Sequence, residues 1–228
     1  MVKTQIYSLV SVEEALECVK AGADHIGVLV EDEGTGCPCH VTLETAKAIF
    51  DAVGNTAVRV LIPSTPYEDH IIAYAKATGP DVIHLSGSYK SSAAFVERVH
   101  KELPGVRIMQ AIGVTGPESV TQVVERAPFA DLLLLDTMIP NERGGIGAVG
   151  KTHDWNLDKA IVDAVDIPVI IAGGLGPDNV EDAIRAVHPY GVDSLTKTSI
   201  KDEDGKLKCK DIALVQQFCE RAHGVSGE

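Results

Sequence analysis

Short apolar runs alternate with longer stretches of helical periodicity from one end of the chain to the other. The apolar runs are compact and rich in β-branched residues, which is typical of parallel strands that are covered on both faces. There are eight such runs: 4–9, 25–30, 57–62, 81–85, 106–114, 131–136, 168–172 and 192–198.

The stretches between these runs carry signals for the start and end of helices. Ser11 followed by Glu14 forms a capping-box pattern, and Gly22 is expected to end that first helix. We expect Glu14 on the exposed face of this helix, so that Glu14→Ala would be a neutral change. The last helix is expected over residues 211–222, with apolar residues along one stripe.

Eight strands that are each followed by a helix predict an α/β fold, a single (β/α)₈ TIM barrel over residues 1–228. Eight parallel strands close on themselves, whereas five or six leave an open sheet. The alternative is a flavodoxin-like open sheet in which one of the eight runs is not a strand. The linkers contain no Ser/Gly-rich stretch or charge block that would mark a domain boundary.

Composition and charge narrow the class of partner. The formal net charge is -13, and no basic stripe offsets it, which argues against nucleic acid as a partner. The five cysteines lack the spacing of a disulfide framework, which favours a reducing compartment. No signal-peptide pattern or bilayer-length apolar run is present, so we expect a cytoplasmic protein without a membrane partner.

Glycines follow the seventh predicted strand at Gly173, Gly174 and Gly176, and a helix is expected from Pro177. Glycines let backbone N–H groups approach an anion, and a helix N-terminus adds partial positive charge. This position in a barrel is often a phosphate site. The alternative is a tight turn that needs glycine only for its backbone angles.

A carboxyl group stands at the end of the sixth predicted strand, where Asp136 follows four leucines. Burial at this position disfavours the charged form and raises the pKa, which suits a general acid near neutral pH. The alternative is that Asp136 caps the following loop. Arg143 in that loop would grip a substrate anion or be a solvated charge.

Several motifs occur in one order along the chain: Leu-Leu-Leu-Asp-Thr ending at Thr137, Gly-Gly-x-Gly, Lys-Thr-x-Asp-Trp ending at Trp155, Ala-Gly-Gly-Leu-x-Pro-x-Asn-Val ending at Val180, and Gly-Val-Asp ending at Asp193. Together they resemble the phosphoribosylanthranilate isomerase family, the Amadori-rearrangement enzymes of tryptophan biosynthesis. The resemblance implies a (β/α)₈ barrel, a phosphorylated sugar substrate and no metal or organic cofactor. It also implies an acidic aspartate at the end of strand six and a basic cysteine at the end of strand one.

The aspartate of the family matches Asp136, but the cysteine has no match. Where the family has Lys-Ile-Cys-Gly, this chain has Gln-Ile-Tyr-Ser, so that Tyr7 stands at the position of the base. An unperturbed tyrosine has a pKa near 10 and is a poor base at neutral pH. The arginine that the family uses for the substrate's carboxylate falls at Cys39, and the family's Ser-Gly pair after strand eight is replaced around 196–199.

Three residues are therefore candidates for the base: Tyr7, His84 and Cys39. His84 at the end of strand four has a suitable ordinary pKa, but it is equally expected as a structural hydrogen-bonding residue. The run Cys37-Pro38-Cys39-His40 could supply a thiol or hold a soft metal. We expect no metal, because Cys-x-Cys lacks the spacing of structural zinc sites.

The sequence predicts an isomerase that interconverts an aldose and a ketose in a phosphorylated sugar or sugar conjugate. Lys197 and Thr198 are expected to hold the phosphate together with the glycine loop. The alternatives are a lyase or aldolase that uses Lys197 as an imine-forming amine, an epimerase, and a sugar-phosphate binding protein without catalysis. The chain is expected to be a monomer or a homodimer.

Overall fold

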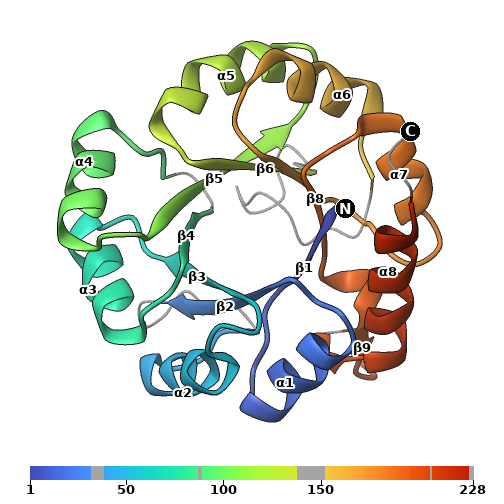
Figure 1. Ribbon diagram of the computed structural model, residues 1–228, viewed down its shortest axis with the longest axis horizontal. Helices are drawn as coiled ribbons and strands as arrows, with labels where there is room; N and C mark the ends of the chain where they lie inside the picture. The colour runs from blue at the N-terminus through green and yellow to red at the C-terminus, as the bar shows by residue number, and fades with distance from the viewer. Residues whose placement is uncertain (32–38, 87–88, 138–151, 206, 226–228) are drawn as a thin grey trace.

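A computed structural model describes residues 1–31, 39–86, 89–137, 152–205 and 207–225. In these residues eight parallel strands pair in sequence order and close into a barrel, β8 pairing with β1 (Figure 1). The barrel strands are β1 (Lys3–Ile6), β2 (His25–Glu31), β3 (Val58–Ser64), β4 (Val82–Leu85), β5 (Arg107–Val114), β6 (Leu132–Thr137), β7 (Val169–Ile171) and β8 (Gly191–Ser194). The predicted TIM barrel is confirmed, and the open-sheet alternative is wrong.

The α-helices lie around the outside of the barrel, as Figure 1 shows down its axis. They are α1 (Val12–Lys20), α2 (Leu43–Val53), α3 (Glu68–Thr78), α4 (Ala93–Glu102), α5 (Glu118–Arg126), α6 (Trp155–Ala164), α7 (Val180–Val187) and α8 (Ile212–Gly224), with a 3₁₀ turn, η1 (Ala127–Phe129), before β6. Most of the buried apolar side chains fill the layer between these helices and the strands. A second, smaller cluster fills the inside of the barrel.

The inside of the barrel is packed rather than hollow. Tyr7, Leu29, Val60, Ile62, Val82, Met109, Leu132, Leu134, Ile170 and Ala172 form its apolar cluster. Gly27 on β2 makes room for the ring of Tyr7, because a Cβ there would lie 2.4 Å from Tyr7 Cδ1. The ring of Tyr7 therefore extends from the end of β1 into the inside of the barrel, against Gly27.

The start of α1 follows the predicted capping pattern only in part. The Ser11 hydroxyl accepts a hydrogen bond from Glu14 N at 3.1 Å. The Glu14 carboxylate accepts from Val10 N at 2.8 Å and from Lys210 N at 2.6 Å. The expectation of an exposed Glu14 is wrong: it is 9% exposed, because a segment from the other end of the chain folds against it.

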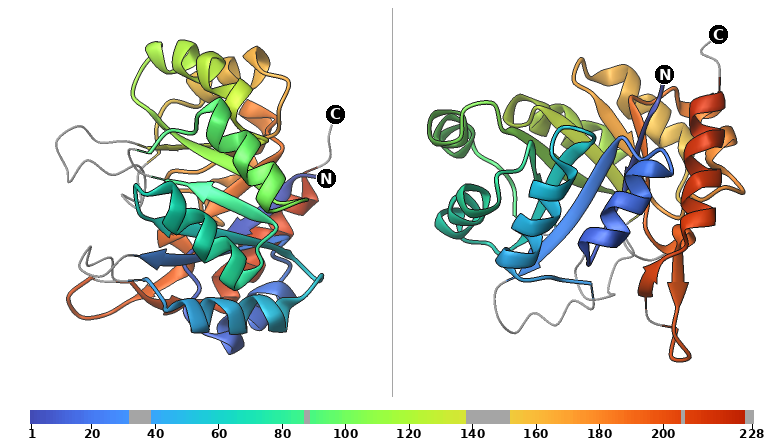
Figure 2. Two further views of the ribbon diagram at one scale, coloured as in Figure 1. Left: turned by 90° about the vertical axis from the view of Figure 1, so that its left-hand side faces the viewer. Right: turned by 60° about the horizontal axis from the view of Figure 1, so that its bottom comes forward.

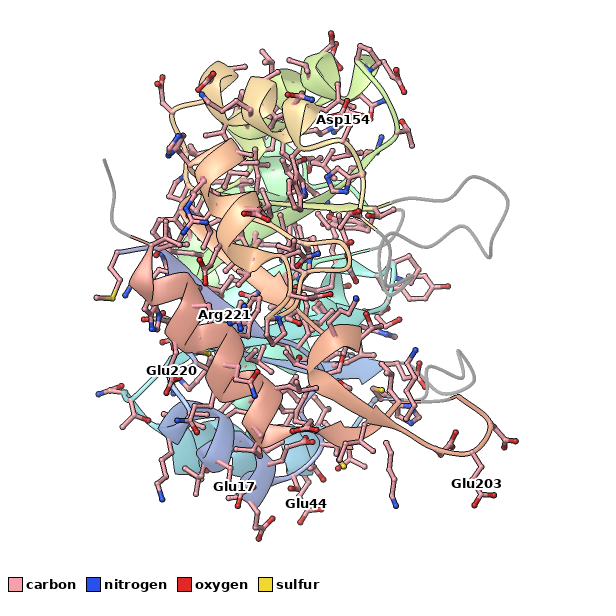
Figure 3. The ribbon with its side chains drawn as sticks, turned by 90° about the vertical axis from the view of Figure 1, so that its right-hand side faces the viewer. Glu17, Glu44, Asp154, Glu203, Glu220 and Arg221 are labelled. Carbon is pink, nitrogen blue, oxygen red and sulfur yellow. The ribbon has the colours of Figure 1, made fainter. Side chains whose placement is uncertain are left out.

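That segment is a hairpin that the sequence did not reveal. β8 ends at Ser194 instead of residue 198, and a 3₁₀ turn, η2 (Thr196–Thr198), leads into antiparallel strands β9 (Ser199–Lys201) and β10 (Leu207–Lys210). Its strands are short and mostly polar, so they lack the apolar signal of the barrel strands. The hairpin projects from the end of the barrel opposite the start of β1 (Figure 2; Glu203 marks its tip in Figure 3).

Candidate active site

A cavity lies at the C-terminal ends of strands β1, β6, β7 and β8. Its lining residues are Tyr7, Asp136, Gly173, Gly174, Leu175, Asp193, Leu195 and Thr196. The fold thus brings together Tyr7, Asp136, Gly173 and Gly174, which the sequence singled out separately. Barrel enzymes carry their catalytic groups at this end of the strands.

Asp136 is half-buried at the end of β6. Burial raises its pKa to about 6, although a hydrogen bond from Thr137 N at 2.7 Å and the nearby His153 act in the opposite direction. A carboxyl group with this pKa holds a proton in part of the molecules near neutral pH. It is therefore in the range in which it can both donate and recover a proton during turnover.

Asp193 is a second carboxyl group of the cavity, and the sequence analysis did not select it. It is 4% exposed, and its Oδ1 accepts a hydrogen bond from Gln5 Nε2 at 3.1 Å. Gln5 Oε1 in turn lies 3.3 Å from His25 Nδ1. Burial, together with the charge of Asp136, raises the pKa of Asp193 well above its ordinary value. The available signal was the Gly-Val-Asp motif, with its carboxylate on the last buried strand.

Tyr7, which lines this cavity, contacts His84. The Tyr7 hydroxyl lies 3.3 Å from His84 Nε2, and the two rings stack with centroids 5.2 Å apart. Burial lowers the pKa of His84 to about 3, and its Nδ1 has no hydrogen-bond partner among the described residues. An imidazole in this state stays neutral near pH 7 and is a weak base, so burial disfavours the predicted role of His84 as the base, and that role stays a prediction.

A chain of three side chains holds the end of β6 against the glycine loop. Thr137 Oγ1 lies 2.9 Å from His153 Nδ1, and His153 Nε2 lies 2.7 Å from Asp158 Oδ1. A Cβ at Gly173 would lie 2.4 Å from Thr137 Oγ1 and 3.1 Å from His153 Nδ1. Position 173 therefore requires glycine for space. His153 is the variable residue of the Lys-Thr-x-Asp-Trp motif, and sequence reasoning passed over it.

The glycine loop has the backbone of an anion cradle. Gly173 and Gly174 have φ angles of 89° and 64°, in the left-handed region that favours glycine. Asn179 ties the loop together, because its Oδ1 accepts from Gly176 N at 2.9 Å and its Nδ2 donates to Gly174 O at 3.1 Å. Helix α7 begins at Val180 behind the loop, three residues later than expected from Pro177.

The other predicted phosphate residues lie outside the cavity. The Lys197 ammonium pairs with Asp178 Oδ2 at 3.2 Å in an exposed position, and Gly176 packs against the Lys197 side chain. The buried Thr198 hydroxyl donates to Ser194 Oγ at 3.2 Å. Their phosphate roles stay predictions, and Lys197 lacks the burial that would activate a lysine for imine formation.

Cys39 is buried in a neighbouring cavity, which is lined by Ser8, Val10, Cys39, Leu195, Ser199, Leu207, Lys208, Cys209 and Lys210. Leu195 lines both cavities. His40 Nδ1 pairs with Glu31 Oε1 at 2.9 Å. Cys37 and Arg143 lie outside the described residues. Within the described part of the chain, no three His, Cys, Asp or Glu side chains are grouped as metal ligands.

A groove at the opposite end of the barrel has a different character. Its lining includes Asp24 and Asp81, which directly precede β2 and β4, and Arg107, the first residue of β5. Asp24 is paired with Lys3 at 2.9 Å, and Asp81 is paired with Arg59 at 2.7 Å. The carboxylates of Asp24 and Asp81 thus already have cationic partners.

Comparison with known proteins agrees with this geometry. The family model of N-(5'-phosphoribosyl)anthranilate (PRA) isomerase matches residues 5–221. The N-(5'-phosphoribosyl)anthranilate isomerase of Methanocella arvoryzae is 34% identical over 223 residues, which cover 97% of this chain and 98% of the relative. That of Rubrobacter xylanophilus is 33% identical over 223 residues, covering 97% and 99%.

Solved structures show the same fold. Phosphoribosyl anthranilate isomerase from Thermotoga maritima superposes with a TM-score of 0.80 at 25% identity, covering 99% of this chain and all (100%) of that one. A phosphoribosyl anthranilate isomerase in complex with reduced 1-(o-carboxyphenylamino)-1-deoxyribulose 5-phosphate has a TM-score of 0.78 at 23% identity, with the same coverage of 99% and 100%. In the described residues, no helix is long and apolar enough to cross a membrane. The chain belongs to the N-(5'-phosphoribosyl)anthranilate isomerase family of (β/α)₈-barrel enzymes.

Proposed function

We propose that this protein isomerises N-(5'-phosphoribosyl)anthranilate, an aldosylamine, to the corresponding 1-amino-1-deoxyketose. The observation that carries the proposal is the position of Asp136. A carboxyl group with a pKa of about 6 shares one cavity with the Gly173–Gly174 loop, so that an acid and an anion cradle face the same space. Family membership supports the same reaction.

The phosphate of the substrate would bind at the glycine loop. Gly173 and Gly174 let the backbone approach the phosphate oxygens, and the N-terminus of α7 lies behind them. Thr196 lines the same cavity after β8 and is the polar side chain next to that loop. In this arrangement the phosphate is anchored on β7 and β8, while the sugar extends towards β6 and β1.

The reaction is a balanced set of proton transfers. Asp136 gives its proton to the furanose ring oxygen, the C–O bond breaks, and the nitrogen lone pair forms an imine cation at C1. A base then removes the proton from C2, and the C–H electron pair forms a C1–C2 double bond that neutralises the nitrogen. The resulting enol becomes the ketone by losing its hydroxyl proton and gaining a proton at C1.

Two groups of the cavity are candidates for the base. Tyr7 is one candidate, but an ordinary phenol requires a pH near 10 to act as a base. Asp193 is a second candidate, because it lines the same cavity as Asp136; its raised pKa favours its protonated form, so it acts as a base when the proton of the pair is on Asp136. Two interacting carboxyl groups that hold one proton between them provide one acid and one base. The pair starts with one proton and still holds one after C2 is deprotonated, now on Asp193.

The test is a fluorescence assay of phosphoribosylanthranilate turnover with four variants. We expect Asp136→Asn and Asp193→Asn each to lower kcat by about 10²–10⁴-fold, and Tyr7→Phe to lower it by about tenfold or less. Glu17→Gln on the exposed face of α1 removes a carboxylate far from the cavity and serves as the control (Figure 3). Absence of turnover in the wild-type protein would overturn the proposed reaction.

We also propose that residues 1–228 form one domain that acts in the cytoplasm. The described cysteines Cys18, Cys39, Cys209 and Cys219 are all unbridged, which suits a reducing compartment. Either a monomer or a homodimer is compatible with this proposal. A Thermotoga maritima relative is described both as a dimer and in monomeric variants.

A further inference from the structure

Lys210, the last residue of β10, is a buried cation with few partners. It is 6% exposed, and its ammonium donates to Ser199 Oγ at 2.9 Å. No carboxylate of the described residues lies within 4.0 Å of its Nζ. The Ser199 hydroxyl itself donates to Leu195 O at 2.6 Å. Among the described residues, the lysine therefore has one neutral acceptor for its three N–H donors.

This arrangement is unfavourable for the protein by itself. Burial lowers the pKa of Lys210, although Glu14, Cys18 and Asp193 lie close enough to act in the opposite direction. A buried ammonium group is tolerated when an anion pairs with it, and a methionine would fill the same space without a desolvation cost. Packing alone therefore does not explain a lysine at this position.

The surroundings of Lys210 are partly polar and border the candidate active site. Lys210 lines the small cavity with Ser8 and Cys39, and Leu195 separates this cavity from the one that contains Asp136. Ser8 follows Tyr7 directly and has a φ of 56°, in the left-handed region that a serine rarely adopts. A strained residue beside an unpaired cation, next to the site, is typical of a ligand-binding position.

We propose that Lys210 binds the carboxylate of the substrate, at the side of the site formed by β8, Ser8 and Cys39. This inference rests on the proposed function. The Gly173–Gly174 loop after β7 already provides for the phosphate, so Lys210 is available for the second anionic group of the substrate, its carboxylate. Cys39, where the family resemblance implies an arginine, lines the same cavity; the positive charge thus comes from the β9–β10 hairpin instead.

The experiment compares two ligands on three proteins by isothermal titration calorimetry. The ligands are reduced 1-(o-carboxyphenylamino)-1-deoxyribulose 5-phosphate and its phenylamino counterpart, which lacks the carboxylate. The proteins are the wild type, Lys210→Met, and Lys201→Met, which removes an exposed lysine of the same hairpin. We expect the wild type and Lys201→Met to prefer the carboxylated ligand by about tenfold or more, and Lys210→Met to bind both ligands equally.

A thermal shift series distinguishes this inference from the proposed function. Benzoate should raise the Tm of the wild type and Lys201→Met but not that of Lys210→Met, whereas inorganic phosphate should raise all three. Lys210→Met without ligand should have a higher Tm than the wild type, which a structural role for the lysine would not produce. If benzoate raises the Tm of the wild type but the wild type does not turn over phosphoribosylanthranilate, the proposed reaction is refuted and the carboxylate site is retained.

Two results would overturn the inference. The first is a Lys210→Met variant that still prefers the carboxylated ligand. The second is loss of phosphate protection in Lys210→Met with benzoate protection intact, which would make Lys210 a phosphate ligand.

Discussion

The two ends of the barrel differ in how their ionisable side chains are paired. At the end where the strands begin, Asp24 accepts hydrogen bonds from Lys3 Nζ at 2.9 Å, His223 Nε2 at 2.8 Å and Thr4 N at 3.0 Å. These partners lower the pKa of Asp24 to about 2 despite its partial burial. The Arg59 guanidinium likewise lowers the pKa of Asp81.

At the end where the strands finish, ionisable groups are buried with few partners. The pKa values of Asp136 and Asp193 are raised, and those of His84 and Lys210 are lowered, in each case chiefly by burial. The first end gains stability from its charges, and the second loses stability to hold groups that are ready for proton transfer or anion binding. This division assigns stability to one end and chemistry to the other.

The largest expected effect is on activity. Asp136→Asn keeps the shape of the side chain but cannot donate a proton, so kcat/KM should fall by about 10²–10⁴-fold. The same change should raise the Tm at pH 7, because it removes a poorly solvated charge. A steady-state assay and a thermal melt on one preparation check both. An Asp136→Asn variant that is active, or that has a lower Tm than the wild type, would contradict the assignment of chemistry to this end of the barrel.

The next effect concerns space at the glycine loop. Gly173→Ala places a Cβ 2.4 Å from Thr137 Oγ1 and should destabilise the fold by about 2–4 kcal/mol and impair phosphate binding. Gly105→Ala at the other end is a matched control: its φ is 88° against 89° for Gly173, and no atom lies within 4 Å of the added Cβ. Gly105→Ala should lower the free energy of unfolding, measured in urea, by about 1 kcal/mol. Equal costs would show that backbone strain alone requires the glycine at 173.

Asp24→Asn should lower stability and leave activity unchanged, whereas Asp136→Asn should raise stability and lower activity. Removing the charge leaves Lys3 and His223 with a neutral partner, which should lower the free energy of unfolding by about 1.5–3 kcal/mol. The kcat should be unchanged, because Asp24 lies at the far end of the barrel from the cavity. Urea titration and the turnover assay measure the two quantities. A loss of kcat equal to that of Asp136→Asn would remove the distinction between the ends.

The smallest effects are in the pH dependence of stability. The charged form of Asp24 should stabilise the fold, whereas the charged form of Asp136 should destabilise it. The pKa of Asp24 is lowered from 3.8 to about 2, so its stabilisation is present above pH 4 and is lost between about pH 4 and 2. The pKa of Asp136 is raised from 3.8 to about 6, so its contribution is favourable below pH 4 and is lost as the pH rises to 6.

Melting curves of both Asn variants against the wild type at pH 2–7 measure these contributions. The deficit of Asp24→Asn should shrink as the pH falls below 4. The gain of Asp136→Asn should shrink as the pH falls from 6 to 4. Two pH profiles of the same sign would contradict the assignment of either carboxyl group.

Local sequence patterns predicted the elements of the barrel because each barrel strand is a compact apolar run. Asp136 and the Gly173–Gly174 loop were found for a related reason, since polar or glycine residues directly after a buried strand must lie at the catalytic end. Glu14 was misplaced because its burial depends on Lys210, 196 residues away. Asp193 was missed because its role depends on Asp136, which reaches the same cavity from another strand.

The sequence by itself determined the number of barrel strands, the closure of the barrel and the end at which the candidate site lies. These follow from period, length and parallel strand direction, which are local properties. The tertiary structure alone decided which ionisable groups are buried there with few partners. Burial of Asp193, His84 and Lys210 is a sum over side chains from several strands and the β9–β10 hairpin, and pKa values depend on that sum rather than on neighbours in the chain.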